Sequence, residues 1–443
     1  MEMPPGPPVS GPSGPPPLAE DPSGPADDSD ESTLVTDRER ALADEAANRR
    51  LVATIAAVAL VVVAAMIGAF LLTRDHGGSG QEAPDEANPP LSVPTATSVA
   101  EEPVDEAALD TLIPDLQAFV EEERGLEFQE DIDLEILDDA AYADRAESDF
   151  AEDLVDTRED LENSAAALQA LGLWPADTDP VDVVSQFAAV GSLGYYDPAT
   201  GAMVVRGSAD TPNLRITLVH ELTHALEDQH FELDRPALDD AFDESGLAFS
   251  ALVEGSASRV DAAYSATLTD GERAQADAEQ QALVAGIDLD TFPAILLAQQ
   301  QFVYVTGTAF VESIFEQGGN AAIDRALRQP PTTSEQILEP DDWPDREVVV
   351  DVPVPEADED AVDEGVVGQF LLHVLTSIDS GAESTPEWDG DSSVLWRDGE
   401  LACLRMAIAG DLDEFEDSLG PWAAEVGADL SREGDVVTAT SCR

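Results

Sequence analysis

Lysine is absent from the chain, and its 20 basic residues, all arginine, are set against 94 aspartates and glutamates, for a formal net charge of −74. Such a surface repels phosphate groups, so it excludes nucleic acid as a partner and gives no help in binding anionic lipid. A composition of this kind is compatible with life at high salt. A solvated surface explains the charge more simply than selection of cationic substrates does.

Cysteine is nearly absent as well, since only Cys403 and Cys442 occur. Neither has the spacing of a zinc ligand pair, which argues against a thiolate metal centre. Both lie in the part of the chain that we expect outside the cell, where disulfides persist. We therefore expect one disulfide between them.

The first hundred residues lack the composition of a folded domain. Residues 1–50 are rich in proline, glycine, serine and aspartate, which predicts a disordered acidic tail. Residues 51–72 form an apolar run without a charge, long enough at 1.5 Å per residue to cross a bilayer as a helix. Residues 73–103 contain glycines and prolines without an apolar period, which predicts a linker.

Arginines lie mainly before the apolar run, at Arg38, Arg40, Arg49 and Arg50, and only Arg74 lies near it on the other side. Basic flanks remain in the cytoplasm. We therefore expect a single-pass protein of the cell membrane with a cytoplasmic N-terminus and an extracellular folded part.

The most informative segment is His220-Glu221-Leu222-Thr223-His224. Residues four apart lie on one face of a helix, so the two imidazoles would aim at one point, a spacing that suits a tetrahedral metal, usually Zn²⁺. Glu221 could then take a proton from a water molecule beside the metal. The sequence predicts His220 and His224 as metal ligands and Glu221 as the catalytic base.

A third protein ligand is needed, and Glu254 is the favoured candidate. It lies thirty residues beyond His224, among apolar neighbours that would make an unpaired carboxylate costly.

His230, six residues after His224, is the alternative. An unbroken helix would turn it about 240° away from His224, and Glu227 stands where a helix-breaking glycine would be needed. His230 would then be a helix-end residue, and Asp228 could orient a ligand or simply be solvated.

Residues 194–206 predict a β-hairpin with a turn at Asp197–Gly201. In zinc peptidases, a strand just before the helix with the two histidines often forms the edge on which extended substrate lies, by strand addition. Stabilising a transition state also requires an electrophile. The candidates, among which spacing does not choose, are Tyr195, Tyr196, Tyr264, Tyr304 and His373.

Over about residues 190–340 the chain resembles gluzincin-type bacterial zinc metallopeptidases, membrane-anchored or secreted. The resemblance depends on GYYDPATGAMVVRG, HELTHALEDQHF, ALVEGSA, YVTGTAFVESIFEQGG and PPTTSEQIL. It implies a thermolysin-like core with His220, His224 and Glu254 as zinc ligands and Glu221 as the base. Ser258 stands where the thermolysin pattern has an acidic residue four positions after Glu254, which leaves the partner of His220 unassigned.

We expect an α+β fold: a mostly helical zincin-like domain with a small sheet at residues 104–345, and a C-terminal α/β extension packed on it at residues 346–443. Within the extension, the alternation over residues 347–354 predicts a strand. The expected function is that of a membrane-anchored zinc endopeptidase acting on proteins or peptides outside the cytoplasmic membrane. A non-catalytic zinc-containing scaffold or binding ectodomain is the alternative, but a structural zinc usually has four protein ligands and only three good ones are found.

The arginine asymmetry around residues 51–72 generates a first prediction. Protease added outside intact cells should degrade the chain after residue 75 and spare the N-terminal tail, as detected with antibodies against each part. Protection of the segment around His220 in intact cells would contradict the extracellular assignment.

Overall fold

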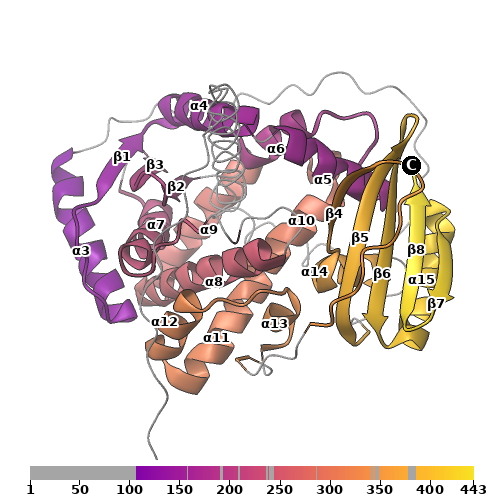
Figure 1. Cartoon of the computed structure of the whole chain (residues 1–443). Helices are drawn as coiled ribbons and strands as arrows, with labels where there is room; N and C mark the ends of the chain where they lie inside the picture. Colours follow the sequence, from indigo (N-terminus) through magenta and orange to yellow (C-terminus); the bar gives the residue numbers. More distant parts are fainter. Residues whose placement is uncertain are drawn as a thin grey trace, which may run out of the picture. The chain divides into compact units, whose positions relative to one another are not determined.

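The computed structural model describes residues 106–443 apart from Thr157 and residues 190–192, 208–209, 236–237, 239–243, 286, 341–342, 345–348 and 378–385 (Figure 1). All the described residues belong to one compact unit. The expected tail, transmembrane segment and linker, residues 1–103, lie outside the described residues.

The described part is α+β, which confirms the expected class. Helices dominate it up to residue 338. They are α3 (Glu106–Arg124), α4 (Asp139–Asp156), α5 (Arg158–Ala170), α6 (Pro180–Ala189), α7 (Pro212–Phe231), α8 (Glu244–Thr267), α9 (Asp270–Val284), η2 (Leu289–Thr291), α10 (Ala294–Gln301), η3 (Phe302–Thr306), α11 (Gly307–Gly318), α12 (Asn320–Arg328) and α13 (Glu335–Leu338).

A three-stranded sheet accompanies these helices, with strand order β1 (Asp133–Leu137), β3 (Ala202–Arg206), β2 (Gly194–Asp197). β1 runs parallel to β3, and β2 runs antiparallel to it. The β2–β3 turn forms because Asp197 accepts hydrogen bonds from the turn and Gly201 adopts a positive φ of 72°. β2 is therefore an edge strand of this sheet.

Helix α7 has well-defined ends. The Thr211 hydroxyl accepts the N–H of Leu214, and Pro212 occupies the first helical position, where its missing N–H costs nothing. At the other end Glu232 adopts the left-handed conformation, and the Asp228 carboxylate accepts the N–H of Leu233. These caps fix the frame of the helix that carries both histidines.

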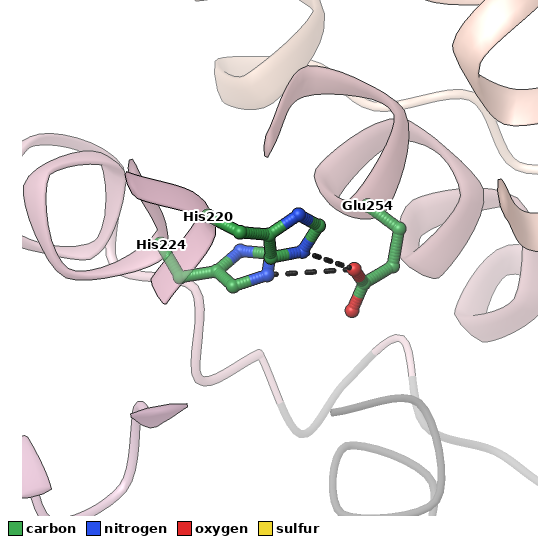
Figure 2. Close-up of side chains that lie close together, drawn as sticks. All are labelled: His220, His224 and Glu254. Atoms are coloured by element: carbon green, nitrogen blue, oxygen red, sulfur yellow. Dashed lines mark hydrogen bonds and ion pairs between the residues drawn. The ribbon is translucent and has the colours of Figure 1, made fainter. Parts of the chain in front are cut away.

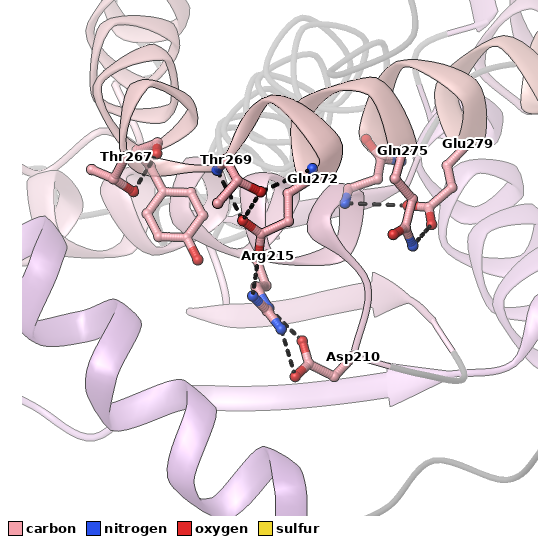
Figure 3. A network of polar contacts seen from close by, with 9 residues as sticks. Asp210, Arg215, Thr267, Thr269, Glu272, Gln275 and Glu279 are labelled. Atoms are coloured by element: carbon pink, nitrogen blue, oxygen red, sulfur yellow. Dashed lines mark hydrogen bonds and ion pairs between the residues drawn. The ribbon is translucent and has the colours of Figure 1, made fainter.

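Polar contacts attach the first turns of α7 to α9 (Figure 3). Arg215 pairs with Asp210 and lies 3.7 Å from Glu272, which closes a reciprocal capping box with Thr269 at the start of α9. The Glu279 carboxylate, further along α9, accepts the N–H of Asn213. Helix α9 thus supplies a partner for one N–H that the first turn of α7 leaves unsatisfied.

The core of this region lies around α7 and α8. Leu218, Leu222 and Leu226 of α7 are fully buried against Met203 of β3 and Val260 of α8. The contacts of α7 extend to α3, α8, α9 and the sheet, so apolar packing surrounds the histidine-bearing turn.

One helix in the described part of the chain, Ala294–Gly318, is long and apolar enough to cross a membrane. It comprises α10, η3 and α11, and half of its most apolar window is buried inside the protein. Buried core helices meet the same criterion, and Phe310, Val311 and Ile314 belong to the main hydrophobic cluster. The expected span at residues 51–72 lies outside the described residues.

A five-stranded antiparallel sheet, drawn in orange and yellow in Figure 1, follows. Its order is β4 (Ala361–Gly365), β5 (Trp388–Asp398), β6 (Leu401–Gly410), β8 (Val436–Cys442), β7 (Asp429–Glu433), with α14 (Gly368–Ser377) and α15 (Leu412–Val426) between strands. Trp422 of α15 packs in a cluster with sheet residues and α5, and its indole N–H donates to Leu171 O. Cys403 and Cys442, paired directly across β6 and β8, form a disulfide.

The prediction of a strand at residues 347–354 is wrong for the part that the structure describes, because Val349–Val354 join no sheet. The valines do alternate there, but Pro353 and Pro355 lack the N–H groups that a ladder requires. The segment is held instead by the Val350 N–H, which donates to Asp389 O, and by the Ser392 hydroxyl, which donates to Pro353 O.

The disulfide should contribute to stability because it closes a loop between residues 39 apart and restricts the unfolded chain. Replacing both Cys403 and Cys442 by serine should lower the free energy of unfolding by about 3–4 kcal/mol. Denaturant unfolding of the oxidised parent and the double variant measures this. An unchanged midpoint would show that the bridge adds no stability.

A buried carboxylate lies where α8 meets α14. Glu244, in the first turn of α8, accepts a hydrogen bond from the Ser334 hydroxyl and packs against the backbone of Gly368. Burial raises the pKa of Glu244 to about 8, the hydrogen bond from Ser334 opposes this, and the nearby Asp391 adds to it. The folded protein therefore holds a proton that the unfolded chain releases.

This buried carboxylate predicts a pH dependence of stability. Between the ordinary glutamate pKa of 4.5 and the folded value of about 8, only the folded state binds the proton, so stability falls as the pH rises through this window. Glu244→Gln should flatten that part of the profile, measured as unfolding free energy from pH 4 to 9. A variant with the parent's slope would contradict the assignment to Glu244.

Candidate metal centre

Two helices supply the polar side chains of the site. His220, Glu221 and His224 belong to α7 and Glu254 to α8, and all four side chains are buried. Because an α-helix repeats every 3.6 residues, the two histidines project from the same face one turn apart. Both imidazoles point toward the carboxylate of Glu254 (Figure 2).

The separations of the ligand atoms fit a small tetrahedral cation. His220 Nε2 lies 3.1 Å and His224 Nε2 lies 3.4 Å from the same Oε2 of Glu254. The three ligand atoms all lie within 4.8 Å of one another. Ligands on a tetrahedral zinc with bonds of about 2.0–2.1 Å stand roughly 3.3 Å apart. Two of the separations match this edge, so the three side chains could hold a metal ion.

The other nitrogen of His220 has a carboxylate partner. Its Nδ1 lies 2.8 Å from Oδ2 of Asp261, whose side chain is 22% exposed. A carboxylate on this nitrogen fixes the tautomer and the ring orientation of a metal-binding histidine, leaving Nε2 to coordinate. Asp261 thus provides the partner of His220 that the sequence left unassigned.

Strong electrostatic coupling links His220 and Glu254. Burial lowers the pKa of His220, but the hydrogen bonds and charges of Asp261 and Glu254 outweigh it and raise that pKa to about 10. Burial likewise raises the pKa of Glu254, yet His224 and His220 outweigh it and lower that pKa to about 2. The carboxylate is therefore ionised and the imidazole charged, and a divalent cation would compete for the place of the shared proton.

Glu221 is one of several buried groups with unsatisfied atoms in the described part of the chain. Neither of its carboxylate oxygens has a side-chain hydrogen-bond partner there, and the side chain is fully buried. Burial raises the pKa of Glu221 to about 7, while His220 and His224 lower it. An ionisable group buried beside three candidate metal ligands is a candidate for proton transfer.

Tyr304 reaches the same site from a third helix. Its buried hydroxyl donates a hydrogen bond to Glu254, and burial together with the charges of Glu254 and Glu221 raises the pKa of Tyr304 well above its usual value. It is therefore a neutral donor. Tyr304 belongs to η3, a π-helical turn in which the N–H of Gly307 bonds five residues back to Phe302 O.

Two glycines allow that turn to approach α8 closely. A Cβ on Gly255, the residue after Glu254, would lie 2.4 Å from Gly307 O. A Cβ on Gly307 would lie 2.2 Å from Ala251 O. Backbone therefore touches backbone beside Glu254, and any other residue at either position would push Tyr304 away.

The remaining candidates for an electrophile are committed elsewhere. Tyr195 donates to Asp149, Tyr196 donates to Asp228 at 2.8 Å, and Tyr264 interacts with Arg215. His373 lies on α14, outside the group of candidate metal ligands. Of the five residues considered from the sequence, Tyr304 is the one that contacts a ligand carboxylate.

His230 does not join the ligands. Its Nε2 lies 2.8 Å from the carbonyl of Glu127, and its Nδ1 lies 3.1 Å from the side chain of Gln129. Helix α7 continues unbroken through Phe231, which turns His230 toward the loop after α3. Asp228 anchors Tyr196 and the end of α7 and does not orient a ligand.

Asp261 is the site residue that sequence reasoning missed. A signal was present, because Asp261 follows Glu254 by seven residues, and seven steps of 100° end only about 20° short of two full turns. The thermolysin pattern instead places an acidic residue four positions after Glu254, where this chain has Ser258.

Comparison with known proteins adds little. No protein-family model matches the chain, and no curated protein matches it. A solved structure from Chloroflexus aurantiacus, described as "a putative hydrolase with a novel fold", is 19% identical and has a TM-score of 0.35. The match covers 56% of this chain and 93% of that chain. A likeness at this TM-score carries no argument, so function has to be inferred from the site itself.

Proposed function

We propose that the protein is a zinc-dependent peptidase whose ligands are His220, His224 and Glu254. The observation that carries the proposal is the convergence of these three buried side chains, with the fully buried carboxylate of Glu221 beside them. Two imidazoles and one carboxylate form a donor set that suits zinc, and three protein ligands leave a fourth position open.

The surroundings of the site support a zincin-like reading of the fold. The segment His220–His224 lies on a helix packed against a small sheet, and the third ligand comes from the next helix. β2 lies over Glu221, since a Cβ on Gly194 would be 3.3 Å from Glu221 Oε1. These features agree with the gluzincin resemblance of residues 190–340.

The chain's own groups can perform peptide hydrolysis. Zinc, when bound, would act as a Lewis acid on the scissile carbonyl and on the attacking water. Glu221 would accept the proton of that water and deliver it to the nitrogen of the leaving amine. The neutral hydroxyl of Tyr304 would turn from Glu254 to donate its hydrogen bond to the negative charge that develops on the carbonyl oxygen.

β2 supplies a surface for an extended substrate. It is an edge strand of the three-stranded sheet, and edge strands are the places where an extended peptide can join a sheet. A peptide bound there would run beside β2 with successive side chains pointing to opposite faces. This arrangement favours a peptide or an unfolded protein segment as the substrate. The peptidase would act outside the cytoplasmic membrane if residues 51–72 span it.

Three variants test the ligand and base assignments. Glu221→Gln should retain zinc and lower peptide hydrolysis by at least about 100-fold, because it removes the base but no ligand. Glu254→Ala should lose much of the zinc, since it removes one of three protein ligands. His230→Ala should bind zinc like the parent and serves as the matched histidine control on the same helix.

Metal content and hydrolysis of an unfolded protein, each with and without a chelator, decide the outcome. Zinc lost from His230→Ala but retained in Glu254→Ala would reverse the third-ligand assignment. Parent-like hydrolysis by Glu221→Gln would refute the mechanism. Tight zinc binding with no hydrolysis by the parent would favour the non-catalytic scaffold.

A further inference from the structure

Behind the ligands lies a buried ion pair that the proposed mechanism does not use. Arg124, at the end of α3, donates from Nε to Glu227 Oε1 of α7 at 2.6 Å, and both side chains are completely buried. The hydroxyl of Ser256, on α8, donates to the same oxygen at 2.5 Å. One carboxylate oxygen therefore joins three helices.

The two hydrogen bonds connect the ligand-bearing turns. Glu227 follows His224 by three residues, and Ser256 follows Glu254 by two. The bond between Ser256 and Glu227 is thus a direct polar link between the helix that carries both histidines and the helix that carries the third ligand. Apolar contacts between these helices tolerate small shifts, whereas a short hydrogen bond has a defined length and direction.

Stability alone does not explain this ion pair. Replacing a buried ion pair by well-packed apolar residues is often neutral or stabilising, because desolvation offsets the attraction. Burial does lower the pKa of Arg124, but Glu227 and Asp324 outweigh it and keep the guanidinium charged. The contribution left to the pair is geometric specificity: Arg124 compensates the charge of Glu227, and Glu227 can then accept from Ser256 deep in the core.

We propose that Arg124, Glu227 and Ser256 form a clamp that sets the distance between His224 and Glu254, and with it the affinity and coordination geometry of the metal. The clamp residues touch neither metal nor substrate and act as positioning residues. The inference rests on the proposed function, because it assumes that His220, His224 and Glu254 bind zinc. It also makes the metal centre depend on the docking of α3, which brings Arg124.

The test uses the full-length protein and compares two serine-to-alanine variants in α8. Ser256→Ala removes the bond to Glu227 with almost no change of volume. Ser250→Ala is the matched control, because its hydroxyl donates to Gly246 O within α8 itself. Ser256→Ala should weaken zinc binding about 10-fold, the scale expected for supports of metal ligands, while Ser250→Ala should bind zinc like the parent.

A second variant removes both charges of the fully buried pair, while Asp324, which lies 3.1 Å from Arg124 Nη2, keeps a side chain that is 20% exposed to water. Arg124→Met combined with Glu227→Leu should fold, and its zinc affinity should fall at least as far as that of Ser256→Ala. Cobalt in place of zinc supplies a readout that a purely structural role would not move. Its visible absorption should shift in Ser256→Ala and in the double variant, and remain parent-like in Ser250→Ala, at a temperature where all are folded.

The outcomes are distinguishable. A parent that binds neither zinc nor cobalt overturns the proposed function and the clamp with it. A parent that binds both, while Ser256→Ala and the double variant match it in affinity and in the cobalt spectrum, overturns the clamp and leaves the peptidase proposal standing.

Discussion

The packing of α7 against α8 imposes one demand on the surrounding structure: the polar groups that it buries must find partners. His220, Glu227 and Glu254 lie among buried side chains that are mostly leucine, valine and alanine. A buried polar or charged group without a partner costs several times what one hydrogen bond returns. Elements distant in sequence therefore approach these side chains, and each brings a specific group.

The partners arrive from different directions. Asp261 extends the same face of α8 to reach His220, Arg124 comes from α3 to compensate Glu227, and Tyr304 comes from the π-helical turn. Glu221 is among the exceptions, because neither of its oxygens has a side-chain hydrogen-bond partner among the described residues. A carboxylate buried in this way costs stability, and such a cost is expected where a residue is kept for a function.

What could be predicted from the sequence was local. The histidine-bearing helix and the β2–β3 hairpin follow from short-range periodicity. A single helix is enough to bring His220 and His224, four residues apart, onto one face. The approach of Glu254 was inferred from the cost of an isolated carboxylate. The role of Tyr304 could not be inferred, because it depends on a π-helical turn and on a backbone contact between two helices.

The same limits explain the errors. The side chains of Val349–Val354 alternate as in a strand, but proline lacks the backbone N–H that a sheet requires. Alternation of side chains does not reveal which residues can donate a backbone hydrogen bond. Asp261 was missed because the expected spacing came from resemblance, whereas the helix offers two equivalent spacings on one face. The partners of Glu227 lie more than 20 residues away in sequence, beyond the reach of any periodicity.

The π-helical turn has a consequence for how this chain can change. It places one additional residue in the helix from Ala294 to Gly318, and each residue of an α-helix advances by about 100°. Deleting a single residue between Phe302 and Thr306 would restore a regular helix and rotate everything before it by that angle relative to Gly307. Tyr304 would then face a different neighbour even if every other side chain were kept. The number of residues in this turn is thus as constrained as their identity, so the turn can change by substitution but not by deletion.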